Sequence, residues 1–263
     1  MTTRRLAMVG GGNMGAALLG GVLAARWAEP DELAVVEVLA ARRHELEARF
    51  PGVLVTDTIP AAEAAVIAVK PYDVAAATAA AVAAGARRVL SIAAGVTLAS
   101  IEAATGDDGV AVVRAMPNTP ALVGEGAAAI AGGAAATDDD LAWAEGILGA
   151  VGTVVRVPEH QLDAVTGLAG SGPAYLFLVA EALVDAGVLA GLARPVAEAL
   201  VHQLFVGSAA LLAEHGDPAR LRAMVTSPGG TTAAGLRELE VHGVRAAFLD
   251  AVTAATRRSR ELA

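Results

Sequence analysis

A glycine-rich turn near the start of this 263-residue chain constrains its fold more than any other feature. Gly10, Gly12 and Gly15 have the spacing G-x-G-x-x-G, between a short apolar run at 6–9 and a helical pattern over 14–26. In that context the first glycine permits a tight turn, the second lets a pyrophosphate approach the backbone, and the third lets helix and strand pack closely. The motif therefore predicts a dinucleotide site, with a flexible glycine loop as the simpler alternative.

The same segment has a second interpretation. Arg4 and Arg5 precede an uncharged stretch, as in a secretory or twin-arginine leader. The glycines interrupt that stretch, and cleavage would remove the motif, so we expect a strand, a turn and a helix. The free N–H groups at the helix start favour an anion, which places Asn13 and Met14 among the predicted cofactor contacts.

Short apolar runs alternate with helical patterns through the first half of the chain. The runs that predict strands lie at residues 6–9, 33–36, 53–55, 65–69, 89–92 and 110–113. Continuous apolar strands joined by helices predict a mostly parallel sheet with helices on both faces, the doubly wound α/β class.

The β pattern fades after about Pro158, and helices are expected over 173–187, 195–213 and 244–260. We therefore expect an α/β dinucleotide-binding domain over 1–157 and an all-α domain over 158–263. The first of these three helices carries apolar residues around much of its circumference, which predicts burial on more than one side and an obligate dimer.

Composition excludes several classes of protein. The chain has no cysteine, so disulfides, a thiol nucleophile and cysteine-based zinc sites are absent. A net charge of −9 argues against nucleic acid as the main partner, because phosphate binding needs a basic face. The five histidines show no metal-ligand spacing, so no metal is expected. The uncharged stretch 164–180 contains Gly170, Gly172 and Pro173, so we expect buried core rather than a membrane span.

Residues after the second expected strand bear on the choice between NAD and NADP. Glu37 stands where an acidic residue would bind the adenosine ribose and favour NAD. Arg42 and Arg43 follow and could instead meet a 2′-phosphate. These residues give conflicting predictions, and a solvated charge cluster is the alternative to both.

Two further strand ends carry candidate site residues. Lys70, the only lysine, follows the fourth expected strand at the edge of the sheet where ligands bind in such folds. Asn118 lies in a proline-flanked turn after the sixth strand and offers both donors and acceptors. A solvated lysine and a purely structural turn are the alternatives.

The segment Ser227–Thr232 precedes an expected helix. Its glycines expose backbone N–H groups, Thr231 and Thr232 add hydroxyls, and the helix N-terminus favours an anion. Ordinary capping needs one hydroxyl, so this segment predicts a carboxylate site, with capping as the alternative.

Taken together, the sequence resembles the pyrroline-5-carboxylate reductase family, and the resemblance covers nearly the whole chain. The matching segments occur in the family's order. They are Gly10–Gly15, Ala68–Pro71, Ser91–Gly95, Arg114–Asn118, Gly170–Tyr175, Asp185–Gly187 and Val225–Thr232.

The resemblance implies reduction of 1-pyrroline-5-carboxylate to L-proline by NAD(P)H, usually NADPH, with NADH possible. It implies a cytoplasmic enzyme with an N-terminal Rossmann domain and a helical domain that dimerises, with decamers as a higher assembly. The substrate pocket would form where the nicotinamide meets the Ser227–Thr232 loop, with the partner chain contributing.

The resemblance also assigns roles to residues. Thr232 would bond the ring nitrogen, and Lys70 would act at the reaction site. The cofactor set is Gly10, Gly12, Asn13, Met14, Gly15, Glu37, Arg42, Ala68, Val69, Lys70, Pro71, Ala93, Ala94 and Asn118. The substrate set is Val225, Ser227, Pro228, Gly229, Gly230, Thr231 and Thr232.

Three features depart from the family pattern. Val38 follows Glu37 where many relatives carry a basic or small polar residue, the stretch between Val55 and Ala65 is short, and Ala223 replaces a frequent acidic residue. A dehydrogenase of another small carboxylate, of the 3-hydroxy-acid type, and a non-catalytic dinucleotide sensor are the competing interpretations.

Overall fold

The computed structural model describes residues 3–262. Two compact units make up the chain: the first takes in the residues up to Ser171 and again those from Thr253, and the second spans Gly172–Val252. The compact units separate after Ser171. The expected domain boundary at 157/158 stays a prediction.

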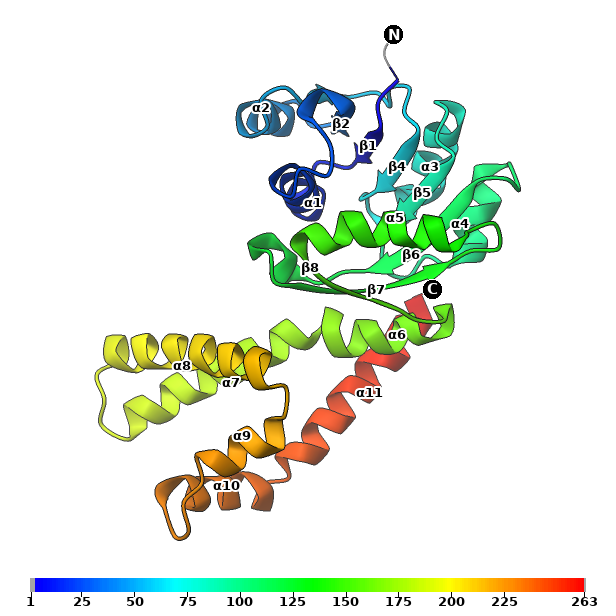
Figure 1. Ribbon diagram of the computed structural model, residues 1–263. Coiled ribbons are helices and arrows are strands. Elements are labelled where there is room, and N and C mark those ends of the chain that lie inside the picture. The colour runs from blue at the N-terminus through cyan, green and yellow to red at the C-terminus, as the bar shows by residue number, and fades with distance from the viewer. Residues whose placement is uncertain (1–2, 263) are drawn as a thin grey trace. The chain divides into compact units, whose positions relative to one another are not determined.

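The first unit is built on one eight-stranded sheet of order β3-β2-β1-β4-β5-β6-β7-β8 (Figure 1). Its strands are β1 (Leu6–Val9), β2 (Leu33–Val36), β3 (Leu54–Thr56), β4 (Ala64–Ile67), β5 (Arg88–Ser91), β6 (Ala111–Met116), β7 (Gly126–Gly132) and β8 (Gly152–Arg156). Neighbouring strands are parallel except β6 and β7. The expected mostly parallel sheet is therefore confirmed.

Helices cover both faces of this sheet. Every residue of β1, β2 and β4 is therefore buried, whichever face its side chain points to. The helices of the first unit are α1 (Asn13–Ala24), α2 (Ala40–Arg49), α3 (Val74–Ala83), α4 (Leu98–Thr105), α5 (Asp138–Leu148) and α6 (Leu162–Val165). One core cluster joins α1, α2 and α5 to the sheet, and a second joins α3, α4 and α6 to the opposite face.

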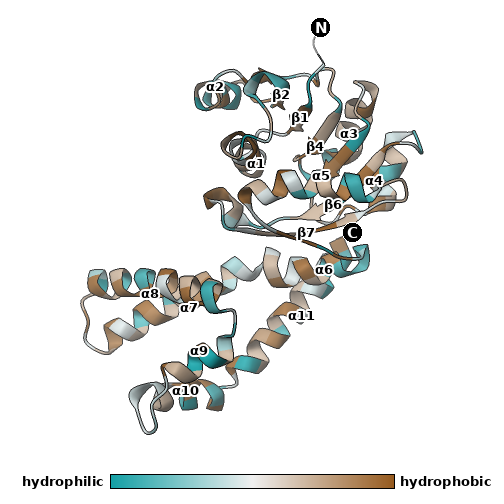
Figure 2. Cartoon of the chain, in the orientation of Figure 1, coloured by the Kyte–Doolittle hydropathy of each residue, from teal (hydrophilic) through white to brown (hydrophobic). Residues whose placement is uncertain are grey.

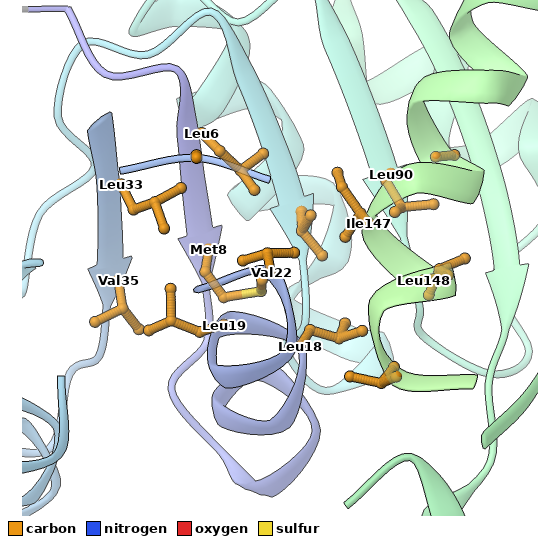
Figure 3. Packing of buried hydrophobic residues seen from close by; sticks show 14 of the residues in the cluster. Leu6, Met8, Leu18, Leu19, Val22, Leu33, Val35, Leu90, Ile147 and Leu148 are labelled. Carbon is orange, nitrogen blue, oxygen red and sulfur yellow. The ribbon is translucent and has the colours of Figure 1, made fainter. Parts of the chain in front are cut away.

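Side chains of α1 form the centre of the first cluster. Leu18, Leu19 and Val22 are fully buried. In Figure 3, Val22 lies beside Met8 of β1, Leu19 lies on the side of Val35 of β2, and Leu18 lies on the side of Leu148 of α5. Burying one such side chain contributes about 1.5–3 kcal/mol, so this contact holds the start of α1 firmly at the end of β1.

Strands β7 and β8 and helices α4 and α5 were absent from the sequence expectations. Strand β7 has the sequence GAAAIAG, in which Ile130 is the one β-branched residue and no residue is aromatic, so local sequence marks it weakly as a strand. It forms because β6 and β8 pair with its two edges and its central residues are buried. Tertiary pairing therefore overrides local propensity here.

Five helices complete the chain: α7 (Gly172–Leu189), α8 (Arg194–His215), α9 (Pro218–Met224), α10 (Thr231–Val241) and α11 (Val244–Leu262). In the second unit the buried apolar cluster consists of Val184, Ala197 and Val201. Large apolar side chains elsewhere on α7 and α8 are exposed, including Phe177 at 65% and Leu204 at 53%. Figure 2 shows hydrophobic residues along both helices. The stretches Glu159–Leu189 and Arg194–His215 are long and apolar enough to cross a membrane, judged by length and composition only.

Helix α5 begins with a capping box. Asp140 donates its N–H to the Thr137 hydroxyl, and its Oδ2 accepts from the Thr137 N–H at 2.9 Å and from the hydroxyl at 2.6 Å. Its Oδ1 accepts from Arg88 Nε at 2.7 Å, which ties α5 to β5. Burial alone would raise the pKa of Asp140, but the hydrogen bonds from Thr137 and Arg88 outweigh it and hold that pKa below its ordinary value.

Asp140→Asn is expected to lower the free energy of unfolding at neutral pH by about 2 kcal/mol, because a buried network loses its charged acceptor. A lowered folded-state pKa means that the ionised Asp140 stabilises the protein above its unfolded pKa, at about pH 4, and that this contribution is lost as pH falls through the folded pKa. Urea unfolding across this range should therefore show a smaller acid-induced loss in the variant. Asp139→Asn, exposed in the same turn, is the control, and equal stability of Asp140→Asn and wild type would contradict the assignment.

Candidate functional site

A groove of about 750 Å³ opens at the carboxyl ends of β1, β2, β4 and β5. Strand order reverses between β1 and β4, the position at which open α/β sheets bind ligands. The residues lining the groove are Val9, Gly10, Gly12, Asn13, Met14, Val36, Glu37, Val38, Leu39, Ala68, Val69, Lys70, Pro71, Tyr72, Ile92, Ala93, Ala94, Met116 and Pro117.

The glycine-rich turn forms the floor of this groove. Gly10 has φ +110°, and a Cβ there would collide with the Ala68 carbonyl. A Cβ on Gly15 would collide with the Gly10 carbonyl, so this glycine permits close packing of α1 rather than contact with a ligand. At Gly12 the space that a Cβ would enter is open. The tight turn at Gly10 and the close packing at Gly15 agree with their expected structural roles, and the pyrophosphate contact of Gly12 stays a prediction.

Gly12 is also the N-cap residue of α1, and its helix start has no side-chain cap. The first N–H groups of a helix then lack partners of their own and carry the positive end of its dipole. An open backbone position beside these groups fits a dinucleotide pyrophosphate.

Glu37 lies at the end of β2, half-buried on the groove wall. Its Oε2 accepts from the Gly11 N–H at 3.2 Å, and its Oε1 accepts from the Leu39 N–H at 3.0 Å. Arg42 lies outside the lining: its Nε donates to the Gly11 carbonyl at 2.9 Å and its guanidinium pairs with Glu45. The cofactor role of Arg42 stays a prediction.

The opposite wall comes from the ends of β4 and β5. Lys70 is exposed on this wall, where its carbonyl accepts from the Asp73 N–H at 2.9 Å and starts a short 3-10 turn at Pro71. Ala93 and Ala94 follow β5 on the same side. The small side chains of Ala93 and Ala94 leave room for a flat ring, such as nicotinamide, to approach this wall.

Asn118 has a structural use. Its Nδ2 donates to the Ala169 carbonyl at 3.1 Å, and its Oδ1 accepts from the Ala127 N–H at 2.8 Å. The side chain thereby joins the turn after β6 to β7 and to the π-helical turn Thr166–Gly170. Its predicted role as a cofactor contact stays a prediction.

In the second unit, the loop between α9 and α10 is a tight turn. The Gly230 N–H donates to the Ser227 carbonyl at 3.0 Å, with Pro228 and Gly229 at the centre and Gly229 at φ +71°. Pro followed by Gly at positive φ is typical of a type II turn. Gly230 is the N-cap of α10, which has no side-chain cap, so neither Thr231 nor Thr232 is used to cap the helix. The N–H groups and hydroxyls at this helix start can therefore meet a carboxylate.

Sequence reasoning missed the apolar part of the groove. Val38, Leu39 and Tyr72 line it with exposed fractions of 77%, 65% and 82%. Their position directly after strand ends was the available signal. Within residues 3–262, no group of three or more His, Asp or Glu side chains is placed to hold a metal ion.

Two family models match the chain. Residues 159–262 match the pyrroline-5-carboxylate reductase dimerisation domain, and residues 5–95 match the NADP oxidoreductase, coenzyme F420-dependent, domain. A curated pyrroline-5-carboxylate reductase from Synechocystis is 47% identical over 98% of this chain and 98% of its own length. The chain belongs to the pyrroline-5-carboxylate reductase family.

Solved members of the pyrroline-5-carboxylate reductase family share this fold. The reductase from Coxiella burnetii superposes with a TM-score of 0.92 at 34% identity, covering 100% of this chain and 99% of that one. The Plasmodium falciparum reductase, solved with NADP bound, gives a TM-score of 0.82 at 28% identity, covering 100% and 99%. The groove described above, with its open Gly12 and uncapped helix start, fits such a cofactor.

Gly12→Ala is expected to fold normally yet bind NAD(P)H at least ~10-fold more weakly, because its methyl group would enter the space open to the pyrophosphate. Fluorescence titration with reduced nucleotide measures the affinity, and thermal unfolding measures the stability. Gly15→Ala should instead lose stability, by roughly 1–3 kcal/mol of unfolding free energy, because its methyl group would overpack against Gly10. Unchanged affinity in Gly12→Ala would remove the pyrophosphate from this turn.

Proposed function

We propose that this chain reduces 1-pyrroline-5-carboxylate to L-proline with NAD(P)H. The observation that carries the proposal is the 47% identity to a curated reductase over 98% of this chain and 98% of the relative's own length. The substrate is a cyclic imine that bears a carboxylate. Its reduction adds a hydride to the imine carbon and a proton to the ring nitrogen.

NAD(P)H, when bound in the groove, supplies the hydride from its nicotinamide ring. The protein itself binds the substrate and the nucleotide, orients them toward each other and polarises the imine. Gly12 and the start of α1 hold the pyrophosphate, and Ala93 and Ala94 border the nicotinamide end.

The Ser227–Thr232 loop would bind the substrate. Its free N–H groups at the start of α10 hold the carboxylate, because an anion is favoured at an uncapped helix N-terminus. The Thr232 hydroxyl would lie at the ring nitrogen, where charge changes during reduction. Ring and nicotinamide must come together for hydride transfer, so the loop orients the imine carbon toward the cofactor.

The protein would work as a homodimer through residues 159–262, the segment that matches the dimerisation model. Exposed apolar side chains on α7 and α8 supply the contact area. A partner chain suits these helices better than lipid, since Glu181, Asp185 and Glu198 lie within them and ionised groups are costly in a bilayer. Assembly into decamers and a cytoplasmic location are parts of the proposal that rest on the family resemblance.

Purified protein with pyrroline-5-carboxylate and reduced nucleotide should form proline, followed by loss of nucleotide absorbance and by amino-acid analysis. A protein that binds nucleotide but forms no proline would favour the sensor interpretation. Turnover of 3-hydroxy acids instead would favour a 3-hydroxy-acid dehydrogenase. Such enzymes usually use a helix-borne lysine as acid and base, whereas Lys70, the only lysine, follows a strand.

Thr232→Ala is expected to lower kcat by about 10²–10³, the usual effect of removing one transition-state donor. Its melting temperature should stay within a few degrees of wild type, because Thr232 caps no helix. Steady-state kinetics and calorimetry measure the two quantities. Thr231→Ala, the neighbouring control, should be milder, and near-normal turnover in Thr232→Ala would take this residue out of the reaction.

Sedimentation at micromolar concentration should show a dimer and no folded monomer. Leu204→Glu is expected to break the dimer, since it places a charge on the exposed apolar face of α8. Val155→Glu is the matched control, because Val155 is equally exposed, at 52%, but lies outside the dimerisation match. A stable folded wild-type monomer would contradict the proposed dimer.

A further inference from the structure

The choice between NADH and NADPH depends on the groups that meet the 2′-position of the adenosine ribose. In a doubly wound sheet this ribose lies at the end of β2, on the far side of the pyrophosphate from the nicotinamide. The residue there is Glu37, whose carboxylate is part of the groove wall.

Glu37 is held in place by the backbone. The hydrogen bonds from the N–H groups of Gly11 and Leu39 engage one side of each carboxylate oxygen. An ionised carboxylate accepts at about four lone-pair sites, so two remain for ribose hydroxyls. The glycine-rich turn and Glu37 therefore form one unit, and the carboxylate cannot swing away without breaking both bonds.

The neighbouring arginines are bound to other groups. Arg42 donates to the Gly11 carbonyl and pairs with Glu45, while Arg43 donates to the carbonyls of Glu37 and Val38 at 2.9 Å each. Arg43 also pairs with Asp57 at 3.6 Å. Neither arginine lines the groove.

The other side chains at this end of the groove have no hydrogen-bond donor to offer. Val38 and Leu39 are apolar, and the Leu39 N–H is already used by Glu37. The cationic groove residue, Lys70, follows β4, and β1 lies between β4 and β2. Lys70 is thus on the nicotinamide side of the pyrophosphate turn.

From these contacts we infer that this reductase prefers NADH to NADPH, with Glu37 as the specificity-determining residue. The inference rests on the proposed function only where it concerns reaction rates, because nucleotide binding to the groove can be measured without substrate. A 2′-phosphate would face a fixed carboxylate, and no side chain that lines this end of the groove offers a donor to balance it. A 2′-hydroxyl would donate a hydrogen bond to the same carboxylate.

The first test is direct binding without substrate. NADH and NADPH are titrated separately against the purified full-length protein, with nucleotide fluorescence as the signal. NADH is expected to bind at least ~10-fold more tightly, a difference of about 1.4 kcal/mol. Equal affinities, or tighter binding of NADPH, would overturn the inference.

Substitution at Glu37 identifies the residue responsible. Glu37→Gln keeps the shape and one acceptor but removes the charge, so the ratio of the two affinities should narrow by about tenfold, mainly by a gain for NADPH. Glu37→Ser provides a second variant, with a smaller side chain and a hydroxyl donor. Glu47→Gln, which removes an exposed charge from α2 outside the groove lining, should leave the ratio unchanged. An unchanged ratio in both folded Glu37 variants would refute the assignment.

Lys70→Ala tests the rival explanation. If Lys70 bound the 2′-phosphate, this variant would lose affinity for NADPH much more than for NADH, and the inference would be overturned. Equal losses for both nucleotides support it, because they place Lys70 away from the 2′-position.

Kinetics separates the two proposals from each other. The value of kcat/KM for proline formation should be higher with NADH than with NADPH in the wild type. Proline formed faster with NADPH would sink the specificity inference and leave the proposed function standing. If NADH binds more tightly as expected but no proline forms, the proposed function would be wrong and the specificity inference would stand.

Discussion

The contact between the Gly10 carbonyl and Gly15 supports both the fold and the site. Because neither residue has a Cβ, the start of α1 lies directly against the end of β1, and Gly10 lies against Ala68 at the end of β4. The apolar residues of α1 then reach the sheet, as Figure 3 shows for Leu18 and Leu19. The N-cap residue Gly12 has no side chain, so the helix start stays uncapped and open to an anion in the same turn that packs closely.

Much of this unit could be predicted from sequence, because its strands are continuous apolar runs and its glycine spacing has a specific geometric meaning. The predictions stopped where local sequence carries little information. Strand β7 is alanine-rich and depends on its two neighbours, and α5 depends on a capping box with an aspartate rather than glutamate at the third position. For Asn118, residue type indicated hydrogen bonding but could not say whether a ligand or the Ala127 and Ala169 backbone would be the partner.

The charged residues after β2 are a second case in which local sequence could not predict which groups meet a ligand. Glu37, Arg42 and Arg43 are close in sequence, and composition alone supports either nucleotide. The deciding information is which carbonyls the guanidinium groups reach, and this depends on how α2 packs beside the glycine-rich turn. A sequence pattern can place charges at a strand end, but only the fold determines which of them face the ligand.

The second half of α11, from Thr253, belongs to the compact unit that carries the groove, and its first half belongs to the other unit. Ser259 donates to Asp163 at 2.7 Å, Arg260 lies 3.9 Å from the same carboxylate, and the Leu262 carbonyl lies beside Gly95. Gly95 directly follows Ala93 and Ala94, which line the groove. The helical segment that matches the dimerisation model therefore ends in contact with the loop that lines the groove. The groove wall is thereby tied to residues far along the chain from the dinucleotide-binding motif, a link that the motif alone could not predict.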